Sequence, residues 1–259
     1  MSESLTYQGH RLDYRWIDAA TPTPTGPAAS TLVFLHEGLG SIGLWRDFPE
    51  RVAAATGAPT LVYSRLGHGR SDPFLQRRGM DYLHREALDV LPAVLDHFGI
   101  VNPVLVGHSD GASIALIHAA SSGRAVRGLV LEAPHSFVEP VTLAGIRDAV
   151  EAAKTTDLLQ KMGRHHDDAP ALFSAWADTW LTPPFADWNI EALLPAIRCP
   201  TLVIQGEADE YGTPEQVHAI TRQVSGPAEG LLLPDCRHTP HRDQPESVLD
   251  ATARFIRSL

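Results

Sequence analysis

The stretch Pro103–Ala112, with the sequence PVLVGHSDGA, decides the fold of this chain. Its first part, Pro103–Val106, is a short apolar run of the kind that forms a buried strand. It continues at once into Gly-His-Ser-Asp-Gly at Gly107–Gly111, and a helical pattern follows. A turn this tight needs glycines beside its central residue, and it holds that residue strained with its side chain exposed above the sheet. We therefore expect Ser109 to be a nucleophile at the carboxyl end of a buried strand.

Outward from this stretch, short apolar runs alternate with longer helical segments. The runs lack polar alternation and are rich in leucine and β-branched residues, as buried parallel strands are. They are Thr31–Leu35, Thr60–Tyr63, Pro103–Val106, Gly128–Leu131, Thr201–Ile204 and Gly230–Leu233. The helical segments are Leu44–Ala55, Asp81–Phe98, Gly111–Ala120, Pro214–Val224 and Pro245–Leu259. This alternation predicts an α/β fold, with a mostly parallel sheet flanked by helices.

Two regions depart from this rhythm. Near the start, Leu5–Gln8 and Arg11–Asp18 predict an antiparallel pair of strands that turns at Gly9-His10, followed by a Pro-rich loop at Thr21–Pro27. Later, 69 residues separate Leu131 from Thr201, although a crossover needs only about a dozen.

The long interval has helical patterns at Ala144–Lys161 and Ala169–Leu181 and holds three of the five tryptophans. We expect a helical cap at 137–190, inserted into a core formed by 1–136 and 191–259. The plainer alternative is two helices packed on the sheet.

Composition excludes several classes of protein. The 259 residues are 44% hydrophobic and suffice for a sizeable core. The 31 acidic residues outnumber the 21 Lys and Arg, which disfavours nucleic acid as a partner. No apolar run is long enough to cross a membrane, and the first twenty residues lack the apolar segment of a signal peptide, so we expect a cytoplasmic protein. Cys199 and Cys236 are expected to be free thiols.

Neither a metal nor a nucleotide cofactor is expected. The run His165-His166-Asp167-Asp168 contains metal-ligating residue types, but adjacent polar residues of this kind more often form a solvated turn. The chain has no P-loop and no Rossmann glycine fingerprint.

A serine hydroxyl is too weakly acidic to attack unaided, so it needs a base, and the base needs a group that orients it. In this kind of sheet the partners follow later strands, in the order Ser, then Asp or Glu, then His. The stretch Gln205–Glu210 (QGEADE) follows one predicted strand, and Pro234–His241 (PDCRHTPH) follows the last. Both stretches therefore carry candidates at the edge of the sheet where catalytic groups gather.

At this point the sequence resembles the α/β-hydrolase family, in its serine-nucleophile esterase and lactonase branch, from Thr31 to Leu259. The matching motifs are FLHEGLG at Phe34–Gly40, SRLGHGRSD at Ser64–Asp72, GHSDG at Gly107–Gly111, GEAD at Gly206–Asp209 and CRHTPHRDQP at Cys236–Pro245. The resemblance implies an α/β-hydrolase fold with Ser109 as nucleophile, Asp209 as the acid and His238 as the base.

The same resemblance ranks the competing residues. The family's acid follows a Gly-x-x-Asp run, which favours Asp209 over Glu207 and Glu210. The family's base is followed two residues later by Pro and then by an acidic residue before Gln-Pro, which favours His238 over His241. His108, beside the nucleophile, is expected to point elsewhere and to be structural.

The oxyanion hole is expected to use two backbone N–H groups. One belongs to Asp110, and the other to Gly38 or Leu39 in the loop after the first parallel strand, where Glu37 stands in place of the usual Gly. The substrate pocket is expected to include Leu39, His135, Trp176 and Trp180. For the two tryptophans, packing between cap and core is an equal alternative.

The resemblance implies hydrolysis of a small-molecule ester, lactone or thioester through an acyl-enzyme. Relatives that hydrolyse epoxides or haloalkanes carry Asp at the nucleophile position, where this chain has Ser109. A ligand-binding receptor with little turnover, and a cofactor-free acyltransferase or perhydrolase, stay open as alternatives, as do a monomer and a homodimer.

Overall fold

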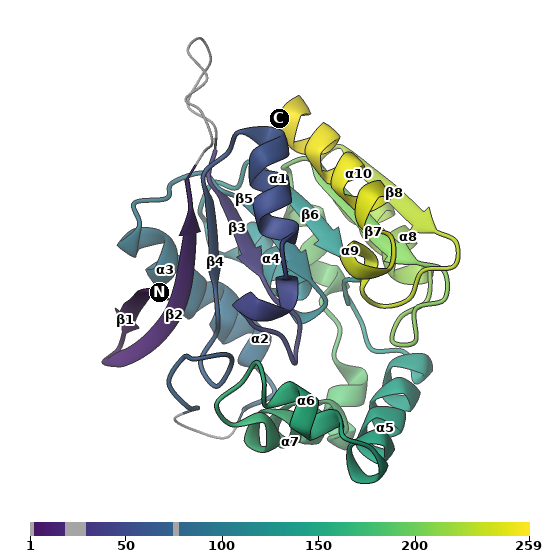
Figure 1. The fold of residues 1–259 in the computed structure, drawn as a ribbon. Helices are drawn as coiled ribbons and strands as arrows, with labels where there is room; N and C mark the ends of the chain where they lie inside the picture. Colours follow the sequence, from purple (N-terminus) through teal and green to yellow (C-terminus); the bar gives the residue numbers. More distant parts are fainter. Residues whose placement is uncertain (1–2, 19–29, 75–77) are drawn as a thin grey trace.

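The centre of the protein is a sheet of eight strands in the order β1-β2-β4-β3-β5-β6-β7-β8 (Figure 1). The computed structural model describes residues 3–18, 30–74 and 78–259, so the loop predicted at Thr21–Pro27 lies outside the described residues. The strands are β1 (Glu3–Tyr7), β2 (His10–Ile17), β3 (Leu32–Leu35), β4 (Thr60–Tyr63), β5 (Val104–His108), β6 (Gly128–Glu132), β7 (Thr201–Gly206) and β8 (Ala228–Leu233). From β4 to β8 in this order all neighbours are parallel, whereas β2 runs antiparallel to both of its neighbours, β1 and β4. The predicted fold class is confirmed.

Burial explains the missing polar alternation in the parallel strands. Every residue of β3, β4, β5, β6 and β7 is buried, because helices cover both faces of the sheet. One face packs against α2 (Tyr82–Arg85), α3 (Leu91–His97), α4 (Asp110–Ser121) and α8 (Glu215–Gln223). The other packs against α1 (Phe48–Thr56) and α10 (Pro245–Ser258), which lie side by side with the short α9 (Pro240–Asp243) at one end.

Several predicted boundaries shift for local reasons. The hairpin turns at Gln8-Gly9, not at Gly9-His10, because these two residues adopt the positive φ angles that a two-residue turn requires. The helix predicted at Asp81–Phe98 is interrupted by a π-helical turn at Glu86–Val90. The helix predicted from Leu44 begins only at Phe48, after a 3-10 turn that ends at Trp45.

The long interval between β6 and β7 folds into helices below the carboxyl ends of the strands (Figure 1). They are α5 (Pro140–Thr155), α6 (Leu158–Met162) and α7 (Ala169–Trp180), with a 3-10 turn at Pro183–Asp187. A second 3-10 turn, Glu191–Ala196, packs against α4 and α8 of the sheet layer. Within the described ranges no helix is long and apolar enough to cross a membrane.

Candidate active site

Ser109 occupies the tight turn between β5 and α4, with φ 52° and ψ −116°. This backbone conformation is strained for a residue with a side chain, and it turns the hydroxyl away from the sheet. The flanking glycines are required by close approach. A Cβ on Gly111 would lie 1.9 Å from the carbonyl oxygen of Leu35, and a Cβ on Gly107 would lie 2.5 Å from the carbonyl oxygen of Gly111. The motif therefore forms the turn that its sequence predicts.

A chain of hydrogen bonds links Ser109 to two residues from later strands. The Ser109 hydroxyl lies 3.0 Å from His238 Nε2, and His238 Nδ1 lies 2.8 Å from Asp209 Oδ1. In the tautomer that fits both contacts, Nδ1–H donates to the carboxylate and Nε2 accepts from the serine. Burial acts to raise the pKa of Asp209, but the charge and hydrogen bond of His238 and the N–H of Tyr211 outweigh it and hold that pKa below its usual range.

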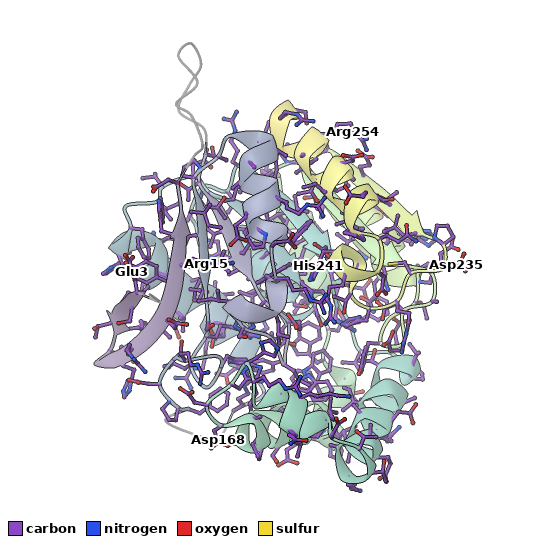
Figure 2. The ribbon with its side chains drawn as sticks, in the orientation of Figure 1. Glu3, Arg15, Asp168, Asp235, His241 and Arg254 are labelled. Atoms are coloured by element: carbon purple, nitrogen blue, oxygen red, sulfur yellow. The ribbon has the colours of Figure 1, made fainter. Side chains whose placement is uncertain are left out.

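The competing residues have other partners. Glu207 is exposed, and Glu210 binds the Arg237 guanidinium at 2.9 Å. His241 lies on the α1 side of the sheet, where its Nδ1 is 2.8 Å from the buried carboxylate of Glu132 (Figure 2). The structure thus brings Ser109, Asp209 and His238 together and leaves the alternatives outside the group.

Backbone N–H groups lie where the oxyanion hole is expected. Asp110 opens α4, so its N–H has no partner within the helix. In the loop after β3 the N–H groups of Gly38 and Leu39 make no hydrogen bond to any described residue, so both stay candidates for the second donor. A Cβ on Gly38 would lie 2.7 Å from the Trp176 indole, which shows that the missing side chain lets this ring close over the loop.

A buried polar network fixes the turn Gly107–Gly111, called the elbow below, against the loop after β3 that contains Glu37. The Asp110 carboxylate lies 3.4 Å from the Arg65 guanidinium and accepts a hydrogen bond from the Tyr82 hydroxyl at 3.0 Å. Trp180 Nε1–H donates to the same hydroxyl at 2.9 Å. Arg65 also donates to the carbonyl oxygen of Glu37 at 2.9 Å, so one buried cation contacts both the elbow and the loop.

Glu37, which stands where the family usually has Gly, pairs with His108. Its Oε2 lies 3.4 Å from His108 Nδ1, and the ring's Nε2–H donates to the carbonyl oxygen of His238 at 2.7 Å. Gly40 makes room for this carboxylate, because a Cβ there would lie 2.3 Å from Glu37 Oε2. Burial opposes the charged ring, but the Glu37 carboxylate dominates and raises the pKa of His108 to about 9. His108 is structural, as expected, and it joins three loops of the site.

This pair predicts how stability varies with pH. A histidine whose pKa is raised by folding stabilises the protein fully below its unfolded value of 6.5, and this contribution is lost as the pH rises through about 9. We therefore expect the melting temperature to fall between pH 7 and pH 10. Glu37→Gln should remove much of this fall, whereas the exposed control Glu229→Gln should keep it. An equal fall in all three proteins would show that His108 does not carry the effect.

A pocket of about 410 Å³ opens above Ser109. All four residues expected to form it, Leu39, His135, Trp176 and Trp180, line it. Sequence reasoning missed other members, among them Thr142 and Ile146 from α5, Leu158 from α6, Tyr211 from the loop that carries Asp209, and Arg242 from α9. The four-residue spacing of Thr142 and Ile146 on one helix face was the available signal.

His135 lines the pocket as a neutral ring. Burial is the main cause that lowers its pKa, and its Nε2–H donates to the carbonyl oxygen of Tyr211 at 3.1 Å. Its Nδ1 has no hydrogen-bond partner among the described residues, so this atom is available to accept from a bound molecule.

We expected all of His165–Asp168 to form a solvated turn, but one of its residues is buried. His166 is buried, its Nδ1 accepts from the N–H of Gly69 at 3.0 Å, and its Nε2–H donates to the carbonyl oxygen of Leu39 at 3.0 Å. The ring thereby ties the loop beside the pocket to the helical segment. Across the described parts of the chain, no three His, Cys, Asp or Glu side chains gather as a metal site would require.

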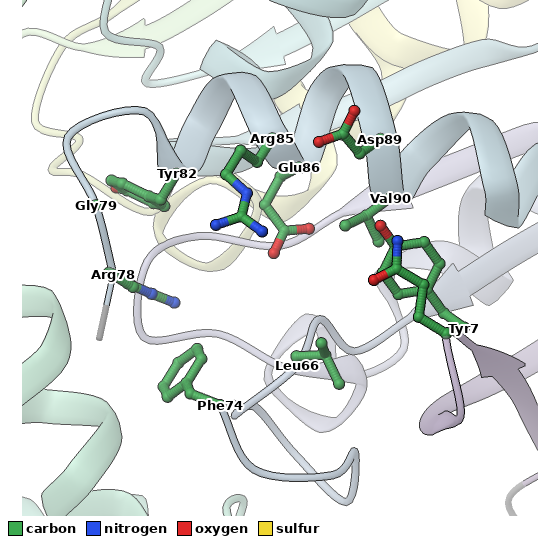
Figure 3. Close-up of a pocket in the computed structure, with 11 residues that line it drawn as sticks. Tyr7, Leu66, Phe74, Arg78, Gly79, Tyr82, Arg85, Glu86, Asp89 and Val90 are labelled. Atoms are coloured by element: carbon green, nitrogen blue, oxygen red, sulfur yellow. The ribbon is translucent and has the colours of Figure 1, made fainter. Parts of the chain in front are cut away.

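A second cavity of about 200 Å³ lies on the far side of Tyr82. Glu86 reaches toward it from the helix, while Leu66 and Phe74 lie opposite (Figure 3). The Arg78 guanidinium packs over the rings of Phe74 and Tyr82, at 4.7 and 4.9 Å from their centres. Tyr82 therefore separates this cavity from Asp110 and the elbow.

Several known proteins resemble the chain in sequence, and two of them illustrate the range. The human serine hydrolase BPHL is 26% identical over 186 residues, which cover 70% of this chain and 63% of that protein, so the chain spans just under two thirds of its length. A 2-succinyl-6-hydroxy-2,4-cyclohexadiene-1-carboxylate synthase from Klebsiella pneumoniae (strain 342) is 30% identical over 268 residues, covering 88% of this chain and 94% of that enzyme.

A solved structure shares the fold over almost the whole length. The enol-lactonase from Burkholderia xenovorans LB400 superposes with a TM-score of 0.73 at 18% identity, covering 98% of this chain and 99% of that one. A model of the alpha/beta hydrolase family matches residues 32–251, the greater part of the sequence. The resemblance carried by the sequence motifs is thus confirmed, and the chain belongs to the alpha/beta hydrolase family.

Proposed function

We propose that the protein is a serine hydrolase that cleaves a small-molecule carboxylic ester, lactone or thioester through an acyl-enzyme on Ser109. The observation that carries the proposal is the hydrogen-bonded chain from Ser109 Oγ through His238 to Asp209, at the floor of a pocket. In this arrangement a nucleophile, a base and the group that orients the base are all within reach of one another.

Each residue then has a defined step. His238 Nε2 takes the proton from Ser109 as the oxygen attacks the carbonyl carbon, and the N–H groups of Asp110 and of Gly38 or Leu39 stabilise the oxyanion. The bond to the leaving alcohol or thiol breaks as His238 returns the proton to it. Water then attacks the acyl-enzyme with His238 again as base, which releases the acid and restores Ser109. Asp209 holds the tautomer and stabilises the charged ring.

We propose that the cap segment 137–190, which contains the helices α5, α6 and α7, forms a lid that determines substrate choice. Thr142, Ile146, Leu158, Trp176 and Trp180 bring side chains from all three helices to the pocket that contains Ser109. A lid of this kind excludes bulk water while leaving a route for the one water that hydrolyses the acyl-enzyme.

The two pocket tryptophans predict different mutant behaviour. Trp176 covers Gly38 and contacts the Phe173 ring, so Trp176→Ala should enlarge the pocket and shift the preferred ester chain toward longer acyl groups. Trp180 also packs against Phe185 and Trp188 and donates to Tyr82, so Trp180→Ala should cost about 3–5 kcal/mol of stability as well. Chain-length profiles and melting temperatures, measured together, separate these effects.

Trp188→Ala is the matched control for both. Trp188 is buried but does not line the pocket, so its loss should lower the melting temperature and leave the chain-length profile unchanged. An unchanged profile in Trp176→Ala would remove the role of this ring in substrate choice and leave only packing.

Labelling with a fluorophosphonate, followed by a screen of esters, thioesters and lactones of graded size, tests the function. We expect label on Ser109 and multiple turnovers on at least one member of the panel. Absence of label on folded protein would contradict the nucleophile. Label with only a single slow turnover would favour a ligand receptor.

A second candidate is a reaction at the same site in which water is not the acceptor. This second candidate is supported by the likeness to an enzyme that is named a synthase, over 94% of that enzyme's length. Acyl transfer to an added alcohol or to peroxide, measured against hydrolysis with the same ester, distinguishes these outcomes.

A further inference from the structure

Arg46 has the same strained backbone as the nucleophile. Its φ of 55° and ψ of −124° are close to the 52° and −116° of Ser109, in a region that only glycine adopts without strain. At Ser109 the backbone strain is explained by the need to expose the hydroxyl. The backbone strain at Arg46 also needs an explanation, because the local turn by itself does not require an arginine at this position.

Ring packing places Arg46 next to a second arginine. The rings of Trp45 and His241 lie 4.7 Å apart and both are buried. Their chain neighbours, Arg46 and Arg242, are exposed and line the same cleft of about 280 Å³. The buried ring pair therefore holds the two guanidinium-bearing residues at one opening.

This cleft adjoins the active-site pocket on the side of His238. The two cavities share four lining residues, namely Glu210, His238, Thr239 and Arg242. In the proposed reaction His238 protonates the leaving oxygen, so the alcohol portion of the substrate departs on this side. In the same reaction the acyl portion is bonded to Ser109, in the pocket that Trp176 and Trp180 also line.

The charges of the cleft leave two cations without partners. The third arginine of the cleft is Arg237, whose guanidinium pairs with Glu210 at 2.9 Å. The backbone N–H of Arg237 donates to the Asp243 carboxylate. The guanidinium groups of Arg46 and Arg242 make no hydrogen bond or ion pair with any residue in the described ranges. An unpaired positive pair beside the catalytic histidine is notable in a chain whose net charge is −10.

We propose that Arg46 and Arg242 bind a carboxylate carried by the alcohol portion of the substrate, and so determine specificity for anionic esters. This inference rests on the proposed function. Guanidinium groups match a carboxylate in geometry and charge, and charge-assisted hydrogen bonds are stronger than neutral ones. The strained turn at Arg46 is then accounted for, because it directs the side chain into the cleft.

The test uses three esters with one acyl group and alcohols of equal size that end in a carboxylate, a carboxamide or an ammonium group. We expect the wild-type kcat/KM for the carboxylate to exceed that for the carboxamide about tenfold or more, and the ratio to fall as salt is added. Arg242→Gln and Arg46→Gly should bring the ratio toward one. Glycine at 46 accepts the positive φ, so this variant removes the charge without straining the turn.

Two further variants sharpen the result. Arg242→Glu should reverse the preference toward the ammonium ester. Arg254→Gln, which makes the same charge change on α10 at the opposite end of the molecule from α7, should keep the wild-type ratio (Figure 2). Equal kcat/KM for the carboxylate and carboxamide esters in the wild type would overturn the inference.

Binding to Ser109→Ala separates this inference from the proposed function. The free hydroxy-carboxylate alcohol should bind Ser109→Ala more tightly than its carboxamide analogue, and the added Arg242→Gln should abolish the difference. Binding with this preference but no ester turnover in the wild type would sink the proposed function and keep the anion site. Turnover of neutral esters with no charge preference would support the proposed function and contradict the anion site.

Discussion

Ser109→Ala is expected to reduce kcat for the best ester of the panel by at least about a thousandfold, because the hydroxyl alone forms the covalent bond. The variant should fold normally. Alanine has no larger side chain than serine, and the elbow is held by the close contacts of Gly107 and Gly111, which the change leaves in place. Initial rates and a melting curve on the same preparation give both readouts.

The matched control is Ser122→Ala, which removes a hydroxyl at the far end of the same helix. Its activity should equal that of the wild type within about twofold. Residual activity of Ser109→Ala above about one hundredth of the wild type would mean that another group makes the covalent bond. Loss of the fluorophosphonate label in this variant, with activity retained, would lead to the same conclusion.

The elbow could be predicted from sequence because its cause is local. A strand, a turn with two glycines and a helix follow each other directly between Val104 and Ser121, and the strain at Ser109 is a property of that short segment. Topology also located the two stretches that carry Asp209 and His238, because parallel strands end at one edge of the sheet. Within those stretches the resemblance to the family was needed to prefer Asp209 over Glu207 and Glu210, and His238 over His241.

The contacts that surround this group could not be predicted, because they join residues far apart in the chain. His166 carries no local signal that would distinguish it from His165, yet it bridges Gly69 and Leu39. The pairing of Glu37 with His108 needs the register of two strands and the space left by Gly40. Arg46 reaches its cleft only because Trp45 packs on His241, almost two hundred residues later.

The helix boundaries that differ from the prediction also depend on contacts between residues far apart in the chain. The π-helical turn at Glu86–Val90 is invisible to a helical periodicity, which extends across it without a break. The delayed start of α1 follows from the strained Arg46 and from Pro49 in the first turn of the helix. A sequence pattern locates a helix by its buried face, but backbone irregularities within it depend on tertiary contacts.

His238→Ala and His241→Ala should differ in kind, although the two residues are three positions apart. His238 contacts both Ser109 and Asp209, so its loss should reduce kcat by at least about a thousandfold at little cost in stability. His241 contacts buried Glu132, packs against the rings of Trp45 and Phe48, and does not line the pocket that contains Ser109. Its loss should cost about 3 kcal/mol or more, because a buried carboxylate loses its partner.

Activity of His241→Ala is the decisive measurement. At a temperature well below its melting point, its kcat should stay within about tenfold of the wild type, because Ser109, Asp209 and His238 keep their contacts. Glu132→Gln combined with His241→Ala should recover part of the lost stability, since a buried amide that has lost its hydrogen-bond partner costs less than a buried carboxylate that has lost it. If His238→Ala retained turnover while folded His241→Ala lost it, the base would be His241. That outcome would require the chain around α9 to rearrange, because in this structure the His241 ring contacts Glu132 and His108 and does not line the pocket that contains Ser109.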